Sequence, residues 1–130
     1  MRKVLAFDGV AIPAWPDTIS STPIPVSTAS TKLFIDIKMT LSKGDGAVIT
    51  LEFQDEARDY WSTVSDLGGA TSPGANDIYA FEYQIKEAGA YLLPVPQRLI
   101  AQGDYRIVLK QFGMAATTGE ITAYLKTGEY

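Results

Sequence analysis

The chain of 130 residues contains no histidine and no cysteine. Serine–histidine and cysteine–histidine catalysis both require an imidazole, and the common zinc sites require histidine or cysteine ligands. These classes are therefore excluded, and disulfide bonds cannot stabilise the fold. An enzyme built from this sequence would depend on carboxylates, on lysine or tyrosine bases, or on a metal ion held by oxygen ligands.

Basic clusters and long apolar runs are also missing. The eleven lysine and arginine residues are spread from Arg2 to Lys126 against fifteen acidic residues, for a net charge of −4. Because nucleic-acid binding usually leaves a basic patch, no nucleic-acid partner is expected. The apolar run from Val4 to Phe7 is shorter than a secretory core, and no stretch approaches the roughly 18 apolar residues of a membrane span. We expect neither a signal peptide nor a membrane partner.

From Lys32 onward, apolar and polar residues alternate with a period of two, which is typical of strands with one buried face. The clearest example is KLFIDIKMTL, and the alternation returns in AVITLEFQ, IYAFEYQIK, DYRIVLKQF and GEITAYLKT. The residues expected to face inward from the four clearest of these segments are Leu33, Ile35, Ile37, Met39, Leu41, Ile49, Leu51, Phe53, Tyr105, Ile107, Leu109, Ile121, Ala123 and Leu125.

Turn signals separate the predicted strands. The sequence GDG at 44–46 tolerates positive φ and predicts a hairpin between the two strands beside it. Pro94 and Pro96 have no backbone N–H, so AYLLPVPQRLI is expected at a sheet edge or in an extended crossing. A strand is also predicted at residues 58–64.

Six to eight strands with turn signals about every ten residues predict an all-β fold, an antiparallel β-sandwich that is jelly-roll-like or immunoglobulin-like. The length is that of one domain. We expect the sandwich to comprise residues 32–130, with residues 1–31 forming an extended N-terminal strand and an arm rich in proline, serine and threonine.

The arm contains VAIPAWPDTISSTPIPVSTAST, and its four prolines keep the backbone extended. Its large apolar side chains are unfavourable in water, so we expect them to be buried. It either wraps its own domain and covers a sheet edge or lies on a neighbouring subunit, with Trp15 as the expected anchor. The residues predicted to form a partner interface are Ile12, Trp15, Ile19, Ile24 and Val26 from the arm, together with Trp61.

No constellation in the sequence points to catalysis. Asp55, Glu56 and Asp59, with Asp66 close behind, lack the spacing of a calcium loop and are interpreted as a solvated loop. A carboxylate pair for glycoside hydrolysis is not indicated either. We assign no catalytic, cofactor-binding or metal-binding residue, and a small carboxylate-dependent hydrolase is the weakest hypothesis.

Aromatic residues make up 11% of the chain, which leaves a carbohydrate-binding module as an alternative. The aromatic residues of IYAFEYQIK share a face with Ile85, which favours core packing over sugar stacking. Tyr60 and Trp61 would point to opposite faces of a strand, so one of them is expected to be exposed. The long loop from Gly68 to Asp77 follows them, and loops of this length are often functional.

In its length, its lack of cysteine and histidine, its arm and the β-rich ending DYRIVLKQFGMAATTGEITAYLKTGEY, the chain resembles small virion proteins of tailed bacteriophages. The likeness is to jelly-roll-like capsid decoration or cement proteins. The resemblance implies a non-enzymatic structural protein without a cofactor, made in the host cytoplasm and located on the capsid surface of the virion. There it would bind the major capsid protein or other virion subunits, often as a small homo-oligomer, and stabilise the shell by bridging subunits.

Overall fold

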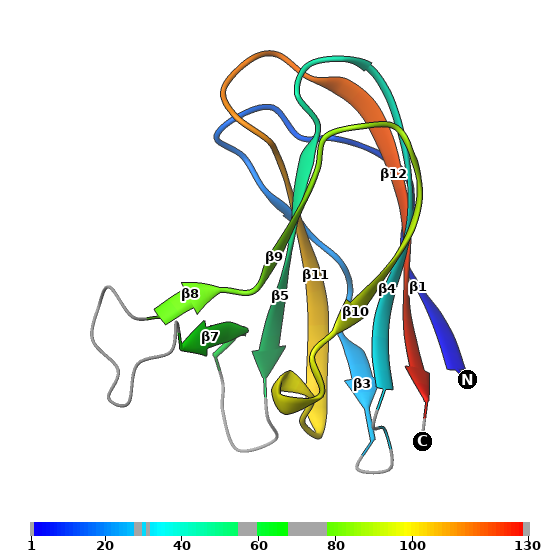
Figure 1. Cartoon of the computed structure of the whole chain (residues 1–130), viewed down its shortest axis with the longest axis vertical. Helices are drawn as coiled ribbons and strands as arrows, with labels where there is room; N and C mark the ends of the chain where they lie inside the picture. Colours follow the sequence, from blue (N-terminus) through cyan, green and yellow to red (C-terminus); the bar gives the residue numbers. More distant parts are fainter. Residues whose placement is uncertain (1, 28–29, 31, 55–59, 68–77, 129–130) are drawn as a thin grey trace.

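The computed structural model describes residues 2–27, 30, 32–54, 60–67 and 78–128 (Figure 1). Two antiparallel sheets pack face to face around one apolar core, so the predicted all-β sandwich is confirmed. The single helix among the described residues is the short 3₁₀ turn η1 (Gln97–Leu99). None of the helical structure in those ranges is long and apolar enough to cross a membrane.

The first sheet, called sheet A, contains the longest strands. Its order is β1 (Arg2–Ala11), β12 (Thr118–Gly128), β4 (Lys32–Lys43) and β10 (Gly89–Val95). β1 and β10 are therefore its edges, and the placement of the proline-containing strand at an edge is confirmed. Proline is tolerated there because an edge strand pairs on one side only.

The second sheet, called sheet B, is built around β11 and β5. Its strands are β2 (Ile19–Ser20), β3 (Ile24–Val26), β11 (Gly103–Gln111), β5 (Ala47–Gln54), β6 (Ser62–Thr63) and β9 (Glu82–Ile85). β2 and β3 pair with one side of β11, and β6 and β9 pair with the far side of β5. A separate two-stranded ribbon is formed by β7 (Ser65–Leu67) and β8 (Ile78–Ala80).

The core is formed by the alternate residues that face inward from both sheets, as the period of two predicts. Leu41 and Phe53 are partly buried against it, and the other predicted inward residues are buried. Full burial of one such aliphatic side chain contributes about 1.5–3 kcal/mol. The residues confirmed as buried are Leu33, Ile35, Ile37, Met39, Ile49, Leu51, Tyr105, Ile107, Leu109, Ile121, Ala123 and Leu125.

The predicted hairpin at 44–46 is wrong. The turn is present, and Gly44 and Gly46 both have positive φ, but β4 belongs to sheet A and β5 to sheet B. The turn therefore carries the chain from one sheet to the other. Local sequence indicates a reversal of direction, whereas the partner of each strand is set by contacts with distant segments.

The strands predicted at residues 58–64 and within IYAFEYQIK are shorter than expected. The first is reduced to β6, and residues 58–59 lie outside the described part of the chain. The second is divided at Phe81, whose N–H donates to the carbonyl of Val64 at 2.8 Å. On one side of this break β8 pairs with β7, and on the other β9 pairs with β5.

The N-terminal segment wraps its own sandwich. In Figure 1 the blue chain leaves β1, passes over one end of the molecule and descends along β11 to β3. Ser21 fixes this segment to β11 by two hydrogen bonds. Its N–H donates to the Ile107 carbonyl and its Oγ accepts from the Ile107 N–H, both at 2.9 Å. The segment thus joins both sheets and covers the edge of β11.

Tyr105 joins the core to the loop that precedes β11. Its ring is fully buried, 5.1 Å from the ring of Phe53 between centroids. Its hydroxyl donates to the Leu99 carbonyl at 2.8 Å and accepts from the Ala101 N–H at 2.9 Å. Burial raises the pKa of the Tyr105 hydroxyl, while the hydrogen bond from Ala101 lowers it by less.

The substitution Tyr105→Phe should therefore destabilise the fold. It leaves two part-buried backbone groups without their partner, which costs about 1–3 kcal/mol of unfolding free energy. The raised pKa means that the folded chain holds this proton more tightly than the unfolded chain, so the stability it contributes is lost as pH rises above about 10. Chemical denaturation at neutral and high pH should show a smaller loss of stability with pH in the variant.

The matched control is Tyr91→Phe, because the Tyr91 hydroxyl donates to the carbonyl of Glu87 in an exposed setting. This change should alter stability by less than about 0.5 kcal/mol. Equal effects of the two substitutions would contradict the role assigned to the Tyr105 hydroxyl.

Candidate interaction surfaces

The residues predicted to form a partner interface divide into two groups. Ile12, Ile24 and Val26 are 6%, 1% and 3% exposed and belong to the chain's own core. Ile19 is partly buried and packs against the same core. Ile12, Ile24 and Val26 therefore present almost no surface to a partner, because the arm buries them within the chain's own fold, and the role expected of Ile19 stays a prediction.

Trp15 remains on the surface, with 56% of its area exposed. It lies beside a hollow of about 280 Å³ on the outer face of sheet B, whose floor includes Val48. Phe112 and Met114 also line this hollow, and Met114 is 74% exposed. The loop that holds Trp15 and the loop between β11 and β12 lie at the same end of the molecule in Figure 1. Together they present two large apolar side chains to solvent.

Trp61 is partly buried, and its neighbour Tyr60 is the exposed member of the pair, at 60%. The guanidinium carbon of Arg106 lies 4.4 Å from the centroid of the Trp61 ring. Arg106 is held there by Glu52, whose Oε1 lies 2.6 Å from Nε and 2.5 Å from Nη2. One face of the indole is therefore covered, and a sugar ring could stack only on the other.

The outer face of sheet A carries a cluster that was not predicted. Leu5 and Leu92 are 44% and 56% exposed on its two edge strands, and Phe34 is partly exposed between them. The signal in the sequence is that Phe34 occupies an outward position in KLFIDIKMTL, where the alternation predicts a polar residue. An aromatic residue at such a position marks a candidate contact surface where other exposed apolar residues share the face.

Charged residues from β1, β12 and β4 form a group on the same face. The Lys126 Nζ lies 3.0 Å and the Lys3 Nζ 3.9 Å from the same oxygen of Asp36. Lys3 also lies over the ring of Tyr124, at 3.9 Å from its centroid. Two ammonium groups therefore share one carboxylate and leave one positive charge in excess.

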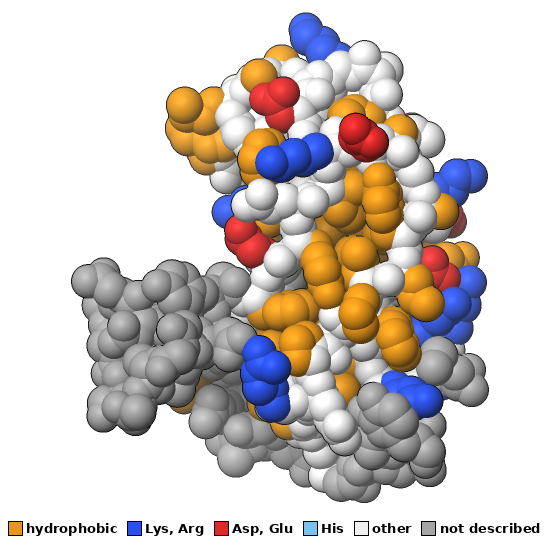
Figure 2. Space-filling model, viewed as in Figure 1, with side chains coloured by type: hydrophobic (Ala, Val, Ile, Leu, Met, Phe, Trp, Pro, Cys, Tyr) orange, Lys and Arg blue, Asp and Glu red, His pale blue; other side chains and the backbone are white. Residues whose placement is uncertain are grey.

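Between β9 and β10 the two sheets leave an apolar seam, which Figure 2 shows as a column of hydrophobic side chains along this side of the sandwich. Tyr83 and Tyr91 line a hollow of about 250 Å³ in it. The Tyr83 hydroxyl donates to the carbonyl of Pro94 and so ties β9 to β10. Burial raises the pKa of Tyr83.

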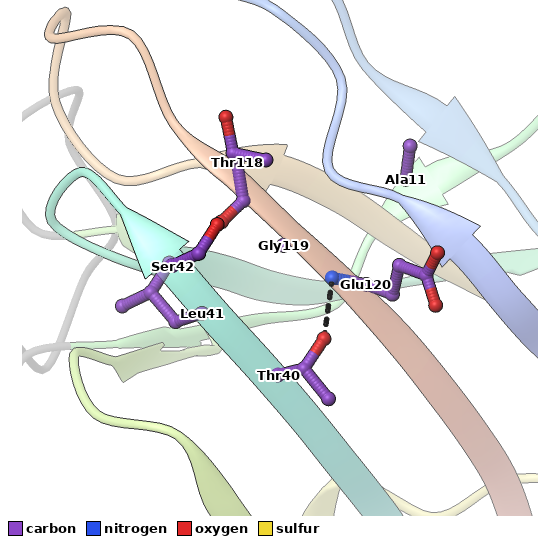
Figure 3. Close-up of a pocket in the computed structure, with 7 residues that line it drawn as sticks. All are labelled: Ala11, Thr40, Leu41, Ser42, Thr118, Gly119 and Glu120. Atoms are coloured by element: carbon purple, nitrogen blue, oxygen red, sulfur yellow. Dashed lines mark hydrogen bonds between the residues drawn. The ribbon is translucent and has the colours of Figure 1, made fainter.

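A further hollow, of about 360 Å³, lies where the register of β12 shifts between Thr118 and Gly119 (Figure 3). Two hydroxyl groups that line the hollow form hydrogen bonds between β4 and β12. Thr40 Oγ1 accepts from the Glu120 N–H at 3.1 Å, and Ser42 Oγ donates to the Thr118 carbonyl at 3.3 Å. The hollow is therefore explained by the irregular pairing of the strands.

Among the described residues, no three acidic side chains lie close enough together to bind a metal ion. The predicted solvated cluster of Asp55, Glu56 and Asp59 lies outside that part, as do the side chain of Asp66 and the loop from Gly68 to Asp77.

No protein-family model matches the chain, and no curated protein matches it in sequence. Among solved structures, it is similar to a chain of infectious bursal disease virus strain Gx, with 14% identity and a TM-score of 0.45. That match covers 99% of this chain and 32% of the viral one, so the chain spans about a third of that length. It is also similar to the crystal structure of FLHE, with 11% identity, a TM-score of 0.35 and coverage of 99% and 97%. Neither similarity is close enough to indicate a shared function.

Proposed function

We propose that this protein is a non-enzymatic structural subunit of a viral particle, and more specifically a bacteriophage capsid decoration protein that binds the assembled shell and reinforces it. One observation carries the proposal: large apolar side chains stand exposed on the outer faces of both sheets, Leu5 and Leu92 on sheet A and Trp15 and Met114 on sheet B. Groups of exposed apolar residues favour contact with other proteins, because their burial there is favourable.

The two groups lie on opposite sides of the sandwich, which supports a bridging role. A subunit that binds one neighbour through sheet A and another through the Trp15–Met114 hollow would connect two components of the shell. Such bridging adds contacts that must break before the shell opens, so it stabilises the particle without any chemical step. The neighbours would be the major capsid protein, other virion subunits or further copies of this chain.

The test uses particles of the source virus from which the protein has been removed. Purified protein should re-attach to them, saturate at a fixed ratio to the major capsid protein, and raise the temperature at which the shell opens. Particles that still carry the protein are the control and should bind no more. Failure to co-sediment with stripped particles, or attachment without any change in shell stability, would contradict the proposal.

A further inference from the structure

We infer that the outer face of sheet A is the docking surface for an acidic protein surface. This inference rests on the proposed function and deepens it, because the acidic surface would belong to the shell. It adds the chemistry of the partner: carboxylates placed opposite lysines, and apolar side chains placed against the leucines at the two edges of the sheet.

Strand register sets the arrangement of this face. Reading across β1, β12, β4 and β10, one row of paired residues is Leu5, Tyr124, Asp36 and Leu92. The next row is Lys3, Lys126, Phe34 and Pro94. Neighbouring members of a row lie side by side on paired strands, so their side chains form one continuous surface. Leu5 and Leu92 lie on the edge strands, and the charged group of Lys3, Lys126 and Asp36 lies beside them, across β1, β12 and β4.

The charge of this face is opposite to that of the whole chain. Its outward positions carry four lysines, Lys3, Lys32, Lys38 and Lys126, against the carboxylates of Asp36, Glu120 and the exposed Asp8, which lies at the register shift of β1. The chain as a whole has fifteen acidic residues against eleven basic ones. A positive face on an acidic protein orients the molecule toward a negative partner and speeds their association.

The ammonium groups of Lys3 and Lys126 are already positioned by contacts within the face. Asp36 binds both Lys126 and Lys3, and the ring of Tyr124 lies under the ammonium group of Lys3. Side chains that are ordered before binding lose less conformational entropy when a partner arrives. The charge left over after pairing with Asp36 is therefore available to a carboxylate of the partner at low entropic cost.

The apolar margins favour a protein partner over the alternatives. Removing the side chains of Leu5 and Leu92 from water is favourable when apolar groups of a partner cover them. The phosphate backbone of a nucleic acid offers few such groups. A second copy binding through the same face would bring one net positive surface against another, and like charges placed together in an interface cost several kcal/mol. The acidic surface of a different protein meets both requirements.

The experiment measures attachment of variants to the stripped particles. The double substitution Lys3→Gln and Lys126→Gln should weaken attachment about 10- to 100-fold, and so should Lys38→Glu, which changes an exposed lysine on the same face. The control is Lys43→Glu, at the end of β4 and outside the outward-facing set, which should attach normally. Attachment of the unaltered protein should weaken as salt rises. Thermal melting verifies that each variant is folded.

Each outcome decides the question. Folded variants that attach as well as the unaltered protein would overturn this inference while leaving the proposed function standing, whereas failure of the unaltered protein to attach would remove both. Attachment that nuclease treatment of the particles abolishes would show a nucleic-acid partner instead. A dimer in solution that the double substitution converts to a monomer would assign the face to a second copy.

Discussion

Removal of residues 1–31 is expected to leave a chain that does not fold cooperatively. The segment supplies β1, an entire edge of sheet A, and both strands that cover the edge of β11. It also places four side chains in the core, Phe7, Ile12, Ile24 and Val26. Truncating a single buried side chain of this size costs about 2–5 kcal/mol. Four such losses, together with the lost strand pairing, are as large as the roughly 5–15 kcal/mol by which a domain is usually stable.

Circular dichroism and thermal melting of the truncated chain would test this expectation. The matched control is Trp15→Ala in the full chain, because Trp15 lies within the same segment but is 56% exposed. It should change the unfolding free energy by less than about 0.5 kcal/mol. A truncated chain that melts cooperatively near the temperature of the full chain would show that the segment is dispensable. Any role of the segment in attachment has to be tested with point variants such as Trp15→Ala.

Gly46→Ala is expected to destabilise the fold by about 2–6 kcal/mol, because it combines two costs. Gly46 has a φ of 113°, a conformation that residues with a Cβ rarely adopt. A Cβ at this position would also lie 2.0 Å from the Ile85 carbonyl oxygen, and backbone cannot rotate away as a side chain can. The carbonyl of Gly46 accepts from the Phe112 N–H at 2.9 Å, so movement of the turn would strain that contact as well.

Gly113→Ala separates these two costs. Gly113 also has positive φ, 75°, but a Cβ there would meet nothing closer than a side-chain oxygen of Asp45 at 3.6 Å. Its cost should be that of backbone conformation alone, about 1 kcal/mol. Denaturant unfolding of both variants gives the comparison, and a Gly46→Ala protein no less stable than Gly113→Ala would contradict the close approach to Ile85.

The sequence predicts which residues face the core because side-chain direction in a strand follows a local rule. Ile35, Ile37 and Ile107 are inward by the period of two alone, and the structure buries all three. The pairing of strands has no such local signal. The turn at 44–46 is correctly predicted as a turn, yet the strands beside it join different sheets, because each finds its partners far away in the sequence.

The candidate surfaces were only partly predictable for a related reason. The apolar residues of the arm indicate a need for burial, and Ile12 and Ile24 are indeed buried. A single sequence does not say whether that burial occurs in the same subunit or in another. The face of sheet A combines Lys3, Asp36 and Leu92 from three separate strands, so it exists only once the sheet is assembled.

The bond from the Tyr83 hydroxyl to the Pro94 carbonyl affects how the chain behaves at high concentration. Pro94 has no N–H to offer, and its carbonyl is already occupied, so this stretch of β10 is a poor template for another strand. The edge of β11 is likewise covered by β2 and β3. At these edges, crowded copies of the chain are protected from growing into fibres by strand pairing. Association of the folded chain is then left to its sheet faces, where contacts depend on a complementary partner surface.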